Sequence, residues 1–202
     1  PASVDLSAPA LAAHAPWLRV WLPWLRAIAS LTVAQKGNVR DSAVVALQRA
    51  LLQSGGSSGE AGAPPISAAF EGVVFPLLAD LLQRAVAGTL DDERLMLRAV
   101  TLLSKVFLHH LATLLTLPNF SVLWLRALEL LQSYLRAPNN ELLLEAVPET
   151  LKNLLLVMAT AGAFEDSSGG EESLAAMTKA VISSWGVPEL QLSWEEAVGE
   201  GK

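Results

Sequence analysis

The sequence predicts an all-α protein, a HEAT/armadillo-like α-solenoid of about six to eight helices. Hydrophobic residues make up 52% of the 202-residue chain and charged residues only 17%, and there is a single tyrosine. This composition is typical of helical proteins rather than of sandwiches or barrels. No stretch of the sequence alternates apolar and polar residues as a half-buried strand would. A nine-residue helical pattern also recurs along the chain, which indicates stacked repeats.

Proline, glycine and asparagine divide the chain into helical segments. The first segment carries apolar residues at helical spacing and is expected to bend at Pro23. Two later segments hold an internal proline, Pro76 and Pro148, and we expect kinks there, the former near Val73. The predicted helices are 16–34, 39–53, 67–87, 91–117, 119–136, 140–160, 174–185 and 189–198.

Polar residues at the segment ends are expected to cap these helices. Gly88 is placed to end the helix before it, and the acidic run 91–93 complements the start of the next one. Asn119 is expected to cap the following helix, and Asn139 or Asn140 the one after that.

The predicted organisation along the chain is one helical-repeat domain with irregular flanks. The linker SGGSSGEAGAPP within it has no means of packing, and the acidic loop after it has the composition of a disordered segment. The divisions are a lead-in 1–15, a helical-repeat domain 16–162 containing the flexible linker 54–65, an acidic disordered loop 163–173, and short helices with a tail 174–202.

Three helices share one local pattern, Ala-Val followed by a basic residue at the seventh position and an apolar residue at the ninth. The three copies are AVVALQRAL (43–51), AVTLLSKVF (99–107) and AVPETLKNL (146–154). With the linker removed from the first interval, both spacings fit the period of about 40–47 residues of HEAT and armadillo repeats. Each helical pair in such an array buries its apolar face only by stacking on its neighbours.

Charge and residue types exclude several classes of function. Residues 1–162 hold 12 acidic and 12 basic side chains, and residues 163–202 hold 8 and 2, so the net charge of -6 comes from the tail. A neutral body disfavours nucleic-acid binding and attraction to anionic lipid by charge alone.

The absence of cysteine excludes disulfides and Cys-ligated metal. Adjacent His109 and His110 point about 100° apart on a helix and cannot chelate together.

The sequence contains no catalytic motif that we can identify. Phosphate-binding loops, nucleophile elbows, zinc-protease motifs and dinucleotide fingerprints are all missing, so no catalytic residue, cofactor or metal is predicted. The chain begins with Pro1 and shows no secretion signal, and we expect it to be a segment of a longer protein. The apolar segments 72–83 and 142–158 are interpreted as buried helices, the first being too short to cross a bilayer.

Two sets of residues are candidates for interactions. Trp17, Trp21 and Trp24 form a stripe on the first helix; core packing is the favoured interpretation, and contact with an upstream segment or another chain is the alternative. On the apolar helix 119–136, which we interpret as a central solenoid helix, charged residues form one narrow polar seam expected to pair along the helix. The members of this seam are Arg126, Glu129, Ser133 and Arg136.

Three blocks of sequence carry a family resemblance. They are WLPWLRAIASL…NVRDSAVVALQRALL (21–52), FEGVVFPLLADLL (70–82) and LMLRAVTLLSKVFLHHL…LPNFSVLWLRALELLQSYL…LLLEAVPETLKNLLLVM (95–158). Over residues 21–164 the chain resembles the C-terminal homology region downstream of the Sec-seven domain in large Golgi Arf guanine nucleotide exchange factors, the subfamily of the brefeldin A-resistance factor, Gea and GNOM proteins. Residues 1–20 and 165–202 lie outside the resemblance.

The resemblance implies a cytoplasmic protein recruited peripherally to Golgi membranes. Its catalytic domain, which exchanges GDP for GTP on an Arf-family GTPase, would lie elsewhere in the parent chain, so no catalytic residue carries over to this segment. The implied role is a non-catalytic regulatory or targeting segment that contacts upstream domains of the same chain or other Golgi trafficking proteins. Two alternatives stay open: a lipid-binding module that inserts an amphipathic helix, 66–87 or 174–185, and a generic protein-binding scaffold.

Overall fold

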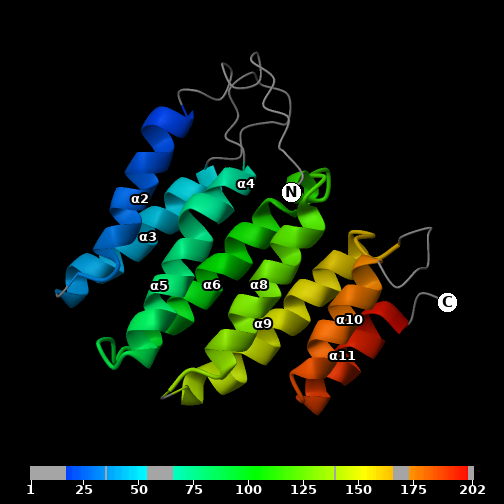
Figure 1. Ribbon diagram of the computed structural model, residues 1–202. Coiled ribbons are helices and arrows are strands. Elements are labelled where there is room, and N and C mark those ends of the chain that lie inside the picture. Colours follow the sequence, from blue (N-terminus) through cyan, green and yellow to red (C-terminus); the bar gives the residue numbers. More distant parts are fainter. Residues whose placement is uncertain (1–16, 35, 54–65, 139, 166–172, 200–202) are drawn as a thin grey trace. The chain divides into compact units, whose positions relative to one another are not determined.

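The chain is all-helical wherever its structure is described. The computed structural model describes residues 17–34, 36–53, 66–138, 140–165 and 173–199, and these ranges contain helices and turns but no strand (Figure 1). The all-α prediction is therefore confirmed over these residues. The predicted lead-in 1–15, the linker 54–65 and most of the acidic loop fall outside them. The chain divides into two compact units, residues 1–77 and 78–202, which we describe separately.

The first unit is built around a helical pair. Helix α2 packs against α3 and against a π-helical turn, η2, that leads into α5. Its elements are η1 (Trp17–Trp21), α2 (Leu22–Leu31), α3 (Gly37–Gln53), α4 (Ile66–Ala69), η2 (Phe70–Val74) and the start of α5 (Phe75–Val86).

Near Val73, where a kink is predicted, the helix contains the π-helical turn η2. Proline has no N–H, so Pro76 removes the donor that would normally reach the carbonyl of Gly72, four residues earlier. That carbonyl accepts a hydrogen bond from Arg26 Nε of α2 at 2.9 Å instead. The acceptor freed by the proline thus becomes the point at which a neighbouring helix is attached.

Gly72 also sets how closely α2 approaches this turn. A Cβ added to Gly72 would lie 3.0 Å from both Arg26 Nη2 and Leu22 Cδ1, a contact tighter than most that real Cβ atoms make. The missing side chain is therefore what lets the guanidinium group reach the carbonyl.

The second unit is a series of antiparallel helices that alternate between two layers. Helices α6, α9 and α11 pack in sequence on one another, and α8 packs on α10 as well as on α6 and α9; Figure 1 shows them side by side. This alternation is the arrangement expected of a helical solenoid. The helices of this unit are the rest of α5, α6 (Glu93–His109), α7 (Leu111–Leu114), α8 (Phe120–Leu135), α9 (Glu141–Thr160), α10 (Leu174–Ser184) and α11 (Pro188–Gly199).

Helix α8 is the central helix that its apolar sequence predicts. Its two largest side chains, Trp124 and Tyr134, are completely buried, and each polar atom has a partner on another helix. Trp124 Nε1 donates to Thr178 Oγ1 of α10 at 2.9 Å, and the Tyr134 hydroxyl donates to the Leu78 carbonyl of α5 at 3.0 Å. Burial raises the pKa of the Tyr134 hydroxyl, which keeps it protonated as a donor.

The recurring nine-residue pattern has one environment in all three copies. The valine at its second position is buried in each, as is the apolar residue at its ninth, whereas the basic residue at the seventh is exposed. The buried residues are Val44, Leu51, Val100, Phe107, Val147 and Leu154, and the exposed ones are Arg49, Lys105 and Lys152. The pattern therefore marks one core-facing stripe in α3, α6 and α9.

The helix caps differ in part from the predictions. Asp92 caps α6 through a bond from Leu95 N to its Oδ1 at 3.0 Å, and Gly88 ends α5 with φ 68°, both as expected. Asn119 occupies the N-cap position of α8 but makes no side-chain cap bond there.

The cap of α9 comes from another helix. Asn140 lies at the N-cap position, but its amide donates to the Leu135 carbonyl at the end of α8. The carboxylate of Glu93, at the start of α6, accepts from Leu142 N and Leu143 N at 2.5 and 3.3 Å instead. The expectation that Asn140 caps α9 is therefore wrong, and its partner in the prediction, Asn139, lies outside the described residues.

The helix predicted over 91–117 ends earlier, at His109. His110 adopts φ -101° and ψ 10°, outside the helical region, and its side chain is buried. This backbone turn separates α6 from the short helix α7.

We predict that Thr178→Val lowers the free energy of unfolding by about 1–3 kcal/mol. Valine keeps the shape of threonine but leaves the buried Trp124 indole N–H without its acceptor. Urea unfolding followed by circular dichroism measures the change. Thr160→Val is the control, because that hydroxyl donates to the Val157 carbonyl of its own helix at an exposed position. Equal losses in the two variants would contradict the assignment.

We also predict that Gly72→Ala destabilises the chain by about 1–3 kcal/mol, because the new methyl group must displace Arg26 or Leu22. Gly37→Ala is the matched control: the nearest atom to its added Cβ is Arg40 Nη2 at 3.7 Å, an ordinary contact. Thermal unfolding of both variants is the measurement. A Gly72→Ala variant as stable as the unaltered chain would show that the close approach is not required.

Candidate interaction surfaces

Two of the three tryptophans in the predicted stripe, Trp21 at the end of η1 and Trp24 of α2, are exposed rather than buried. Trp21 and Trp24 are 47% and 48% exposed, and their rings pack edge to face with centroids 5.3 Å apart. The favoured core interpretation is therefore wrong for these two residues, because α2 turns Leu22 and Leu25 inward instead. The side chain of Trp17 lies outside the described part of the chain.

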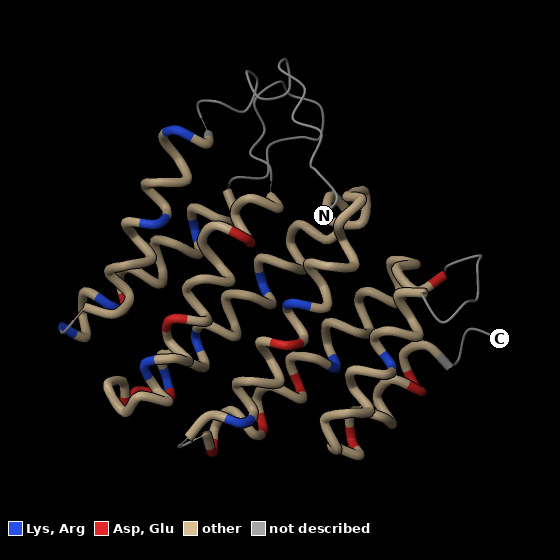
Figure 2. The backbone as a smooth tube through the Cα atoms, viewed as in Figure 1, with Lys and Arg blue, Asp and Glu red and all other residues tan. Residues whose placement is uncertain are grey.

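Two further apolar side chains extend this surface along the helix. We call Val20, Trp21, Trp24 and Leu31, all roughly half exposed or more, the α2 face. The only charged residues of η1 and α2 are Arg19 and Arg26, both basic, as Figure 2 shows. The α2 face is thus an aromatic and aliphatic surface without a carboxylate on its own helix.

The polar seam of α8 is exposed, as its sequence indicates. Arg126, Glu129 and Arg136 are solvent-exposed and Ser133 is half-buried. The Ser133 hydroxyl donates to the Glu129 backbone carbonyl at 2.8 Å, so it serves its own helix. Figure 2 shows acidic and basic residues interspersed over the helices of the second unit.

Arg136, at the end of this seam, borders a groove of about 480 Å³. We call it the Pro148 groove, after the proline of α9 that lines it. It is lined by Gln132, Leu135, Arg136, Leu144, Pro148, Trp185, Val187, Pro188 and Glu189. A second hollow of about 240 Å³ shares Pro148 and Glu189 with it and continues along α9 and α11. No feature of the sequence pointed to this groove, because its walls come from three separate helices and a corner.

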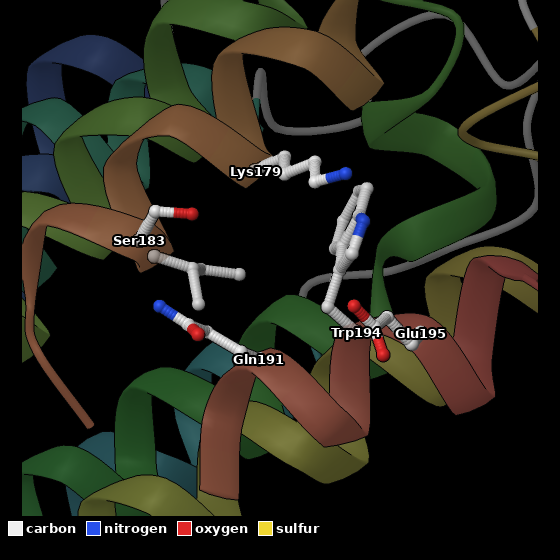
Figure 3. A pocket seen from close by; sticks show the side chains of 6 residues that line it. Lys179, Ser183, Gln191, Trp194 and Glu195 are labelled. Atoms are coloured by element: carbon white, nitrogen blue, oxygen red, sulfur yellow. The ribbon is translucent and has the colours of Figure 1, made fainter. Parts of the chain in front are cut away.

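A smaller pocket lies between α10 and α11. Figure 3 shows Lys179 and Ser183 of α10 facing Gln191, Trp194 and Glu195 of α11 across it. Its volume of about 100 Å³ is below the roughly 300–1,000 Å³ of typical small-molecule sites.

Helix geometry brings no metal-binding cluster together among the described residues: no group of three His, Asp or Glu side chains there could hold an ion. The His109 and His110 rings meet edge to face at 4.7 Å, one exposed and the other buried.

Among the residues that the structure describes, one helical run is long and apolar enough to cross a membrane. It extends over Ile66–Val86, 21 residues, and half of its most apolar window is buried inside the protein. The segment 72–83, whose own length is too short to cross a bilayer, lies within this run, because α4, η2 and α5 are continuous; the run agrees with the predicted helix 67–87 to within one residue at each end. Core helices of soluble proteins meet the same criterion of length and composition.

Comparison with known proteins gives one consistent family. A family model described as the GBF1-like tetratricopeptide repeat region matches residues 21–190. The chain is 36% identical over 165 residues to the Golgi-specific brefeldin A-resistance guanine nucleotide exchange factor 1 homolog of Caenorhabditis elegans, covering 81% of this chain and 8% of that protein. It is 38% identical over 169 residues to the ARF guanine-nucleotide exchange factor GNOM of Arabidopsis thaliana, covering 79% of this chain and 11% of GNOM.

A further Arabidopsis thaliana relative, the ARF guanine-nucleotide exchange factor GNL1, is 31% identical over 154 residues, 71% of this chain and 10% of its own. The chain therefore spans about a tenth of the length of the curated relatives it matches. No solved structure matches it.

Proposed function

Since this chain belongs to the GBF1-like tetratricopeptide repeat family, whose relatives here are Arf guanine nucleotide exchange factors, we propose that it is a non-catalytic regulatory or targeting segment of such a factor. It acts by holding protein or membrane contacts for a parent protein that works in Golgi vesicle trafficking. The parent is cytoplasmic, is recruited peripherally to Golgi membranes, and meets the Arf GTPase through a separate catalytic domain.

The observation that carries this proposal is the exposed α2 face. Large aromatic side chains are enriched where proteins bind one another, because they bury much apolar area at a small cost in conformational entropy. The face stands on a helix that is held in place by the Arg26 to Gly72 bond and by buried Leu22 and Leu25. A fixed helix that turns two indoles outward is suited to docking against another helical segment.

The occupant that fits best is an upstream segment of the parent chain or another trafficking protein. In a helical-repeat array each helical pair covers the apolar face of its neighbour, and the relatives are about ten times longer than this chain. Contact there would couple this segment to domains that precede it.

We predict that Trp21→Ser with Trp24→Ser in the parent protein lowers its Golgi-localised fraction several-fold, because the docking face is lost. Exchange on soluble Arf by the purified parent is expected to stay within twofold. Quantitative imaging and a fluorescent-nucleotide release assay measure the two effects. Val122→Ser is the control, since Val122 is an isolated exposed side chain of α8.

In the same release assay, the isolated 202-residue chain is expected to leave nucleotide release from Arf unchanged. Acceleration by the chain alone would overturn the non-catalytic assignment. Unchanged Golgi recruitment of the tryptophan variant would overturn the docking role of the α2 face.

Direct lipid binding is the second candidate, and the apolar run Ile66–Val86 favours it. Insertion of this helix would remove Phe70, Phe75 and Leu81 from the core, where each is at most 1% exposed. We therefore expect the folded chain to remain unbound in flotation with neutral phosphatidylcholine vesicles and with vesicles containing phosphatidylserine. Co-flotation with both, regardless of lipid charge, would instead support insertion driven by apolar area.

A further inference from the structure

Basic side chains predominate in the unit that carries the α2 face. Among the described residues of this first unit, 1–77, five side chains are basic and two are acidic. Figure 2 shows mostly basic positions along the pair of α2 and α3. The basic residues are Arg19, Arg26, Lys36, Arg40 and Arg49, and the acidic ones are Asp41 and Glu71. An acidic partner complements this local charge.

Arg26 provides a positioned cation on the side of α2 next to η2. Its Nε donates to the Gly72 carbonyl of η2 at 2.9 Å, although the side chain is exposed. This bond fixes the guanidinium group, whose two terminal nitrogens have four further N–H donors that can pair with a carboxylate. Arg19 is also exposed, and it lies two turns earlier on the same side of the helix. Two carboxylates seven residues apart on a second helix can therefore face both arginines.

The dimensions of the α2 face suit a single helix. From Val20 to Leu31 the face extends over about three turns, roughly 17 Å along the axis. Trp21 and Trp24 are 47% and 48% exposed, and since a tryptophan side chain buries about 150–250 Å², the two indoles offer on the order of 200 Å². Even with the two aliphatic side chains, the area stays below the roughly 800 Å² per partner of a standard interface between folded proteins. One side of a short amphipathic helix matches an area of this size.

We infer that the α2 face binds an acidic amphipathic helix of a partner protein. Apolar side chains of the partner helix pack on Trp21 and Trp24, whose edge-to-face arrangement is already formed. Glutamates or aspartates beside its apolar stripe pair with Arg19 and Arg26. This inference rests on the proposed function, because it names the chemistry of the partner at the same surface.

The distribution of charge favours a protein helix over an anionic lipid surface. A membrane meets the field of the whole chain, whose net charge is -6, and is repelled by it. A short helix seated on the α2 face meets mainly the charges within about 10 Å, the screening length at 0.1 M salt. The two charged residues of η1 and α2 are both basic, so the local attraction is felt by the helix and not by an extended anionic surface.

The test uses defined peptides and the complete 202-residue chain. Each fluorescein-labelled peptide has about fourteen residues, four helical turns, with a leucine stripe on one side and alanine and glutamine elsewhere. The first carries two glutamates seven residues apart beside the stripe, and the second carries lysines at the same positions. The third keeps the glutamates but has serine in place of leucine. We expect the first peptide to bind about fivefold or more tightly than either of the others, measured by fluorescence polarisation.

Matched variants locate the binding on the α2 face. Trp21→Ser with Trp24→Ser removes both indoles and is expected to abolish detectable binding. Arg19→Glu replaces one cation by an anion and should remove the preference for the glutamate peptide over the lysine peptide. Arg94→Glu makes the same charge change at an exposed position of α6 in the second unit and should leave the affinities unchanged. Circular dichroism checks that every variant is folded.

The outcomes separate this inference from the proposed function. In proton–nitrogen correlation spectra, the glutamate peptide should shift the indole signals of Trp21 and Trp24 but not that of Trp124, which is completely buried. The inference is overturned if neither leucine peptide binds up to millimolar concentration, or if both bind the unaltered chain equally well. Flotation of the chain with phosphatidylserine vesicles that the double tryptophan variant lacks would overturn it too. Loss of Golgi recruitment by that variant alongside any of these results would leave the proposed function standing.

Discussion

Buried polar atoms on α8 impose the constraint on which the second unit depends. An indole N–H or a phenol hydroxyl that leaves water must find a partner at hydrogen-bond distance. Trp124 meets this requirement on α10 and Tyr134 on α5. Apolar packing alone would tolerate sliding of one helix along another, whereas these directional bonds allow only one register. Helices α5, α8 and α10 are therefore aligned by two hydrogen bonds that lie near opposite ends of α8.

Helix type and position followed from the sequence because they depend on local chemistry. Glycine, proline and the spacing of apolar residues act within one or two turns, so Gly88, Pro76 and the nine-residue pattern were informative without a structure. The cap of α9 was not predictable in this way, because Glu93 is 49 residues from Leu142 along the chain. The prediction that Trp21 and Trp24 pack in the core failed for a different reason. A helix with apolar residues on two sides does not reveal which side is turned inward, and burial of Leu22 and Leu25 rather than Trp21 and Trp24 is decided by the neighbours.

The functional predictions divide in the same way, between features that the sequence shows and features that only the folded chain shows. Membership of an Arf exchange factor family could be read from long blocks of sequence, since many residues contribute to a resemblance and no single one is decisive. The surfaces through which the segment would bind other molecules, in contrast, form only when the helices have packed together. Arg136 was a candidate only as part of a polar seam, and its place at the edge of the Pro148 groove depends on Trp185 and Glu189 from beyond the acidic loop.

The contact between Arg26 and Gly72 links three positions that look unrelated in the sequence. Pro76 has no N–H to donate to the Gly72 carbonyl, and Gly72 has no side chain to block the approach. Arg26 donates to that carbonyl instead. An ordinary residue at 76 would offer its own N–H to the same carbonyl and compete with the guanidinium group. A substitution at position 26, 72 or 76 is therefore unfavourable alone and tolerated only together with changes at the other two. We expect the three positions to change together among members of this family.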